Sequence, residues 1–86
     1  MKPEKNVLEV KVIALRAYLR FCDVAYEIPR EEVYSPIAEC NNEEQLRKII
    51  KMLEANETRI LEHRENWHDV KEIKESFLQK IFNFFK

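Results

Sequence analysis

Glu65 and His68 are the residues whose types and spacing come closest to a chemical site in this chain. On a helix, the Glu-x-x-His spacing places a carboxylate and an imidazole on one face, as in the di-iron carboxylate bundles. The chain has 14 glutamates, so one such spacing arises readily by chance. The expected helix also supplies no second inward-facing acid before the motif. We therefore predict a solvated, ion-paired face here, with no bound metal or cofactor.

The other residue types that carry catalysis are few and poorly spaced. His63 and His68 are five positions apart, which points them to different sides of a helix and excludes a zinc pair. Cys22 and Cys40 have no Cys-x-x-Cys companion, and the apolar neighbours of Cys22 predict a buried free thiol. The chain contains no glycine, so it lacks the usual phosphate-binding loop. These observations predict that the protein is not an enzyme.

Arg47, Lys48 and Lys51 form the best candidate face for nucleic acid. Glutamates alternate with these basic residues at helical spacings, which is typical of a salt-bridged, solvent-facing helix surface. The formal net charge is −1 and is spread evenly along the chain, so bulk electrostatics gives no attraction to a phosphate backbone. A small nucleic-acid-binding regulator therefore stays an alternative, and not the favoured function.

The composition predicts a small all-α domain. Glycine is absent while 45% of the residues are apolar and 36% are charged, which favours helices over tight hairpin turns. The 86 residues suffice for one domain and one core. Charged residues interrupt the apolar stretch after the N-terminus, and no run of 18 apolar residues occurs. We expect no signal peptide, no membrane span and a cytoplasmic location.

The first helix is expected over residues 7–28, after an N-terminal tail at 1–6. Its polar residues form one narrow stripe at helical spacing, namely Glu9, Arg16, Arg20, Asp23 and Glu27. The rest of its circumference is apolar, and a short chain can hardly cover such a helix alone. This pattern favours a homodimer. Residues 8–12 also alternate as a strand would, which leaves a strand paired across a dimer as an alternative.

The remaining chain predicts a connector and two helices. Residues 29–41 contain two proline-led helix starts, at Pro29 and at Ser35-Pro36, and Pro29 is expected to end the first helix. Asn41 and Asn42 both open capping boxes for a helix over 42–66. A final helix is expected over 69–86, capped by Asn66 or Asp69, unless it continues the preceding one.

The C-terminal segment carries a phenylalanine-rich face that needs a docking surface. This protein's own core or dimer interface is the favoured surface, and the alternatives are a groove on another protein and a membrane surface. The predicted shared interface of the homodimer consists of Val12, Leu15, Leu19, Phe21, Leu53, Ile60, Trp67, Phe77, Ile81, Phe82, Phe84 and Phe85.

Together these patterns predict a small helical bundle of three main helices with a short helical connector, completed by homodimerisation. The favoured function is non-enzymatic protein–protein interaction, as an adaptor, chaperone or inhibitor whose protein partner the sequence does not identify. The alternatives are the nucleic-acid-binding regulator and a dimeric metal-carboxylate bundle built on Glu65 and His68.

Overall fold

Residues 5–85 are described by the computed structural model and form four helices, with no strand among them. The helices are α1 (Lys5–Ala25), α2 (Glu31–Glu39), α3 (Glu43–Glu62) and α4 (Trp67–Phe84). The prediction of a small all-α bundle is confirmed. Residues 8–12, whose alternating pattern suggested a strand, lie inside α1. The predicted tail was 1–6, but α1 begins at Lys5, so residues 5 and 6 are helical. Residues 1–4 of that tail and the last residue of the predicted final helix lie outside the described residues.

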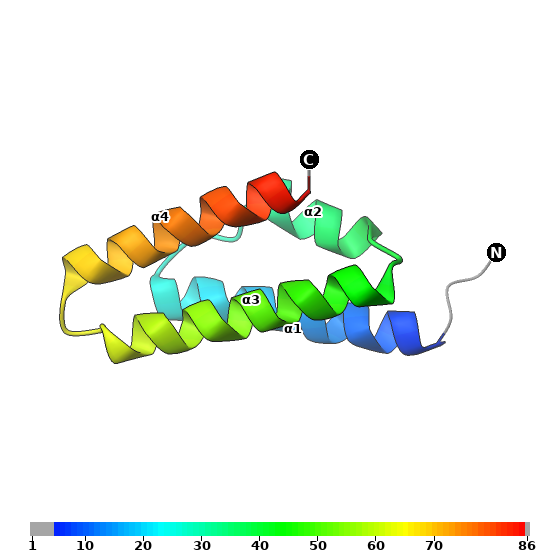
Figure 1. The fold of residues 1–86 in the computed structure, drawn as a ribbon, viewed down its shortest axis with the longest axis horizontal. Helices are drawn as coiled ribbons and strands as arrows, with labels where there is room; N and C mark the ends of the chain where they lie inside the picture. The colour runs from blue at the N-terminus through cyan, green and yellow to red at the C-terminus, as the bar shows by residue number, and fades with distance from the viewer. Residues whose placement is uncertain (1–4, 86) are drawn as a thin grey trace.

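Two long helices run in the same direction, and a third returns along them. Figure 1 shows α1 and α3 side by side, with α4 running in the opposite direction and the short α2 at one end. The molecule is elongated, with extents of 47 × 21 × 19 Å. In the described part of the chain, no helix is both long and apolar enough to cross a membrane.

Asparagine side chains begin both helices of the α3–α4 pair, as the sequence predicts. The Asn42 Oδ1 atom accepts a hydrogen bond from the Gln45 amide at 3.1 Å, and Asn66 Oδ1 accepts one from the His68 amide, also at 3.1 Å. Such caps satisfy amides that have no partner within the helix. Because α3 ends at Glu62 and α4 begins after Asn66, the segment forms two helices and not one continuous helix.

The first helix ends earlier than the proline suggests. Helix α1 stops at Ala25, three residues before the predicted end at Ile28. Tyr26 follows with a positive φ of 54°, and the Glu27 amide bonds to the Cys22 carbonyl at 2.9 Å. This is the Schellman arrangement, in which glycine usually occupies the left-handed position. The left-handed conformation of Tyr26 therefore ends α1 before the chain reaches Pro29.

Helix α2 joins the two predicted proline-led starts into one element. It begins at Glu31, after Arg30, and continues through Pro36. The prediction of a separate start at Ser35-Pro36 is wrong, because the amides of Val33 and Tyr34 already bond to the Arg30 carbonyl one turn earlier. Val33 and Ile37 are fully buried and attach α2 to the core.

One continuous apolar core holds the helices together. Within it, the fully buried Phe21 and Phe77 rings are in contact, with their centroids 4.5 Å apart. In the described residues, no buried polar side-chain atom lacks a hydrogen-bond partner. The core residues are Val7, Val10, Ala14, Ala17, Tyr18, Phe21, Cys22, Ala25, Val33, Ile37, Leu46, Ile49, Leu53, Ile60, Val70, Ile73, Phe77, Leu78 and Ile81.

Candidate interaction surface

The residues predicted to form a shared interface fall into three groups. Five are fully buried inside the single chain: Phe21, Leu53, Ile60, Phe77 and Ile81. Four are partly buried against the same core: Leu15, Phe82, Phe84 and Phe85. Three are exposed: Val12, Leu19 and Trp67. The chain thus covers most of its phenylalanine-rich end by itself. The large apolar side chains that stay exposed lie partly on α1 and partly elsewhere, namely Leu8, Val12, Ile13 and Leu19 on α1, and Tyr26, Ile28, Tyr34, Leu61 and Trp67 outside it.

Four apolar residues of α1 form one row along the helix, while the exposed Ile13 lies on another side of it. Leu8, Val12 and Leu19 are 47%, 46% and 45% exposed, and Leu15 between them is partly buried. Their spacing of four, three and four residues is that of a heptad seam, so all four share one face. We call this row the α1 stripe. A contiguous apolar row of this kind is typical of a surface that another helix covers.

Charged residues border the α1 stripe along one side and at its N-terminal end. In chain order they are Lys5, Glu9, Arg16 and Asp23, all exposed, and we call them the α1 charge row. Their signs alternate along the helix. None of the four forms an ion pair with another described residue. Charged side chains placed at the edge of an apolar seam select the partner and its orientation.

Contacts with the neighbouring segments flank the α1 stripe on both sides. Lys11 donates a hydrogen bond to the Asn41 Oδ1 atom, between α2 and α3, at 2.8 Å. Arg20, beyond the charge row, lies 3.8 Å from the Glu57 carboxylate of α3. These contacts fix the rotation of α1 about its own axis, so the α1 stripe is held facing solvent.

A second exposed apolar group lies where α1 ends and α4 begins. The Tyr26 and Trp67 rings are 6.0 Å apart, and Arg64 donates a hydrogen bond to the Tyr26 hydroxyl at 3.2 Å. Tyr26 is 67% exposed and Trp67 is 52% exposed. We call Tyr26, Arg64 and Trp67 the aromatic end cluster. Tyrosine, tryptophan and arginine are the residues that contribute most often to protein interfaces.

An ion pair beneath the aromatic end cluster holds the end of α1 against α4. The Lys74 ammonium is 3.0 Å from Glu27 and lies over the Trp67 ring, 5.7 Å from its centroid. Burial alone would raise the pKa of Glu27, but the hydrogen bonds and positive charges of Lys74 and Arg30 outweigh it. The pKa of Glu27 therefore lies below its ordinary value, and the carboxylate stays ionised.

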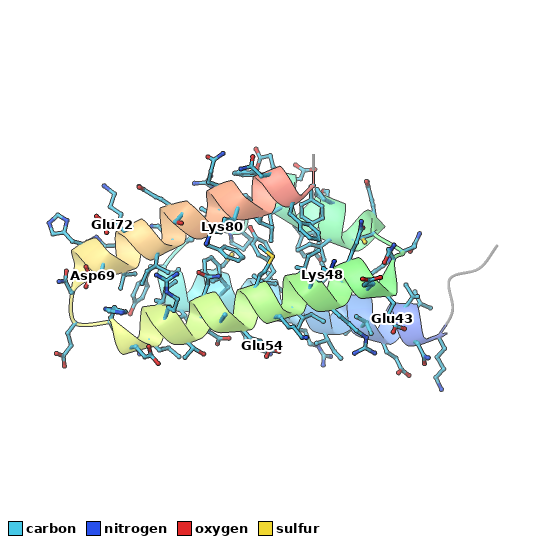
Figure 2. The ribbon with its side chains drawn as sticks, viewed as in Figure 1. Glu43, Lys48, Glu54, Asp69, Glu72 and Lys80 are labelled. Carbon is cyan, nitrogen blue, oxygen red and sulfur yellow. The ribbon has the colours of Figure 1, made fainter. Side chains whose placement is uncertain are left out.

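A polar cleft of about 370 Å³ opens between the end of α3 and the start of α4. Figure 2 shows Asp69 and Glu72 beside the turn that joins these helices. The His63 Nδ1 atom is 3.3 Å from the Asp69 carboxylate, an orientation that acid–base catalysts also use. Ser76 lines the same cleft, but no hydrogen bond joins it to His63 in the described structure. The contact between nucleophile and base that acyl transfer requires is not formed.

The metal candidates Glu65 and His68 do not share a helical face. Glu65 lies in the turn before α4, while His68 lies in the first turn of that helix, because Asn66 caps the helix between them. The helical spacing assumed for the motif is therefore wrong. Within residues 5–85, no group of three or more His, Cys, Asp or Glu side chains could hold a metal ion.

Two of the four basic residues of α3 are paired within their own helix. Arg47 lies 3.0 Å from Glu43, and Lys48 lies 3.7 Å from Glu44. Figure 2 shows Glu43 and Lys48 near the start of α3. Lys51 is exposed on the same helix. The paired glutamates reduce the positive potential that a phosphate backbone would meet.

The buried titratable groups serve the fold. The Tyr18 hydroxyl accepts a hydrogen bond from the Arg30 amide at 2.9 Å, and burial raises the pKa of Tyr18. Burial also raises the pKa of the neighbouring Cys22 thiol. A thiol shifted in this direction is a poor nucleophile at neutral pH. The prediction of a buried free thiol at Cys22 is confirmed.

Sequence reasoning missed Leu8, Tyr26 and Arg64 as surface residues, whereas it included Trp67 in the predicted interface. The signal for Leu8 was present, because it continues the heptad spacing of Val12, Leu15 and Leu19. The contact of Tyr26 with Arg64 and Trp67 joins residues far apart in the chain, so no local pattern could reveal it.

Comparison with protein families, characterised proteins and solved structures gave no match to this chain. The exposed side chains of the α1 stripe and of the aromatic end cluster are therefore the features of this chain that bear on its function.

Proposed function

We propose that this chain is a non-enzymatic interaction protein of the adaptor, chaperone or inhibitor type. It binds another protein chain through the α1 stripe and acts in the cytoplasm. The observation that carries the proposal is the row of exposed aliphatic side chains at Leu8, Val12 and Leu19. These side chains are not part of the core, because other residues of α1 form its buried face. Covering such a row with a second helix removes apolar surface from water, at about 25 cal/mol per Å².

The aromatic end cluster supports an interaction role independently. Trp67 and Tyr26 expose large ring surfaces, yet both are held in place by Arg64, Lys74 and each other. Side chains that are ordered before binding lose little conformational entropy when a partner covers them. The two free cysteines, one of them buried, fit a reducing compartment and support the cytoplasmic part of the proposal.

Position-specific photo-crosslinking tests this function. A photoreactive amino acid replaces Leu19 on the α1 stripe in one variant and Ile13 in the other, and crosslinking is carried out in the cells that encode the protein. The two sites are matched, since both lie on α1 and are 45% and 49% exposed. We expect protein adducts from position 19 and few from position 13. Equal yields, or no adducts from either position, would contradict the proposal.

A further inference from the structure

We propose that the α1 stripe is covered by a second copy of this chain, with the two α1 helices packed antiparallel about a two-fold axis between Val12 and Leu15. This inference rests on the proposed function for the choice of surface and adds the identity and the orientation of the partner. Three features of the described residues lead to it: the symmetry of the stripe, the order of charges in the α1 charge row, and the charges that a parallel pair would bring together.

The α1 stripe is complementary to itself when reversed. Its spacings of four, three and four residues read the same from either end. An antiparallel copy therefore places Leu8 opposite the partner's Leu19, and Val12 opposite the partner's Leu15. Each contact occurs twice, as a two-fold interface requires. The aliphatic side chains can then interdigitate as in a coiled-coil seam.

The α1 charge row is also complementary to itself when reversed. From the N-terminal end its charges are positive, negative, positive and negative, at Lys5, Glu9, Arg16 and Asp23. An antiparallel partner presents the opposite order. Lys5 then lies beside the partner's Asp23, and Glu9 lies beside the partner's Arg16. Glu9, Arg16 and Asp23 are one heptad apart and share one flank of the stripe, while Lys5 lies one heptad before Val12, at the end of the stripe itself. In antiparallel pairs the same flank of each helix faces its counterpart, so Glu9 and the partner's Arg16 meet on one side of the seam.

A parallel pair would bring like charges together. In that orientation, the flank carrying Arg16 faces the opposite flank of the other helix, where Lys11 lies. Arg16 would then meet the partner's Lys11 twice in the dimer. Adjacent like charges at a seam act against the wrong orientation. The antiparallel orientation is therefore the one that these charges favour.

The remaining helices leave the α1 stripe accessible. Helices α2, α3 and α4 all pack on the face of α1 that carries Ala14, Tyr18 and Phe21. The stripe lies beside that face, and its members other than Leu15 are nearly half exposed. A second copy can thus add its own α1 without displacing any core contact of the first.

Sedimentation equilibrium over a wide concentration range, combined with reversal of single charges, tests the proposal. We compare the wild type with Val12→Glu, with the matched control Ile13→Glu, with Glu9→Lys, with Arg16→Glu and with the double charge reversal. Val12 and Ile13 are adjacent, β-branched and almost equally exposed, at 46% and 49%. Circular dichroism of every variant verifies that the helices are retained.

We expect a wild-type dimer that Val12→Glu abolishes and Ile13→Glu preserves. Each single charge reversal places like charges together at two symmetric positions, and should raise the dimer dissociation constant about tenfold at low salt. The double reversal restores opposite charges, so its dissociation constant should return to within about threefold of the wild type. The effects of the single reversals should shrink at high salt.

Other outcomes overturn the inference in distinguishable ways. A wild type that stays monomeric at every concentration overturns self-association, while crosslinks from position 19 to a different protein would still support the proposed function. A dimer sensitive to Val12→Glu but not rescued by the double charge reversal overturns the antiparallel orientation. A dimer lost in Ile13→Glu and kept in Val12→Glu overturns both the inference and the choice of the α1 stripe.

Discussion

The two apolar faces of α1 are built from different side chains. The buried face contains three alanines, Ala14, Ala17 and Ala25, while the exposed α1 stripe consists of three leucines and a valine. Small residues allow α1 and α3 to approach closely, so the bulk of the inner contact comes from Tyr18 and Phe21. The difference teaches that hydrophobicity alone does not decide which face of a helix is buried. The fit to the neighbouring helix does.

Removing bulk from the inner face should have the largest effect. Phe21 is fully buried against Phe77, so Phe21→Ala should lower the free energy of unfolding by about 3–5 kcal/mol. Leu19→Ala on the α1 stripe should cost less than about 1 kcal/mol when measured on the monomer. Urea denaturation at low protein concentration compares the two. Similar losses would contradict the distinction between the faces.

Adding bulk to the inner face should have the next largest effect. Ala14 is fully buried, so Ala14→Leu should force α1 away from its neighbours and cost about 1–3 kcal/mol. Val12→Leu adds one methylene on the exposed side and should change monomer stability by less than about 0.5 kcal/mol. Thermal denaturation followed by circular dichroism measures both. If Ala14→Leu were neutral, close packing would not explain the alanines.

The ion pair between Glu27 and Lys74, just after α1, should make the stability of the fold depend on pH. Because the pKa of Glu27 lies below its unfolded value, its pairing stabilises the fold above about pH 4.3. This contribution is lost as the pH falls through the lowered folded pKa. Lys74→Met should cost about 1–2 kcal/mol at pH 7 and flatten the loss of stability in acid. Lys71→Met, an exposed lysine on the same helix, serves as the control.

A substitution of Tyr26, in the turn after α1, should change the free energy of unfolding least. Tyr26→Gly removes the strain of a positive φ, worth about 1 kcal/mol, but also removes the ring contact with Trp67, worth a similar amount. The free energy of unfolding should therefore stay within about 0.5 kcal/mol of the wild type. In a Trp67→Ala background, the same change should stabilise by about 1 kcal/mol. Destabilisation in both backgrounds would show that Tyr26 is not strained.

The elements of the fold could be predicted from the sequence where the signals are local. Asn42 and Asn66 are capping residues in the sequence and caps in the structure. The end of α1 was predicted wrongly because Pro29 was the nearest recognisable helix terminator in the sequence. The helix instead ends at Tyr26, which adopts a left-handed conformation that glycine usually adopts, so the sequence gives no sign of this end. Pro36 likewise suggested a helix start, although it lies inside α2.

The surface was harder to predict, because it depends on which residues the neighbouring helices cover. Val12 and Leu19 were expected at an interface and are exposed, whereas Phe21 and Phe77 were expected there and fill the core of one chain. Both sets are equally apolar in the sequence. Only the three-dimensional pairing of α1 with α3 separates them. The Glu65 and His68 motif failed for a different reason, since the cap at Asn66 interrupts the helix that would have aligned the two residues.

The parallel arrangement of α1 and α3 also determines the order in which the chain can fold. Helices α3 and α4 meet through a short turn, whereas α1 reaches α3 only after the long connection through α2 has closed. Closing the longer connection costs more chain entropy, so we expect the α3–α4 hairpin to form before α1 docks. Val70→Ala should then mainly slow folding, and Val10→Ala should mainly speed unfolding. Stopped-flow kinetics of the two variants would reveal α1 as the last helix to join and the first to leave.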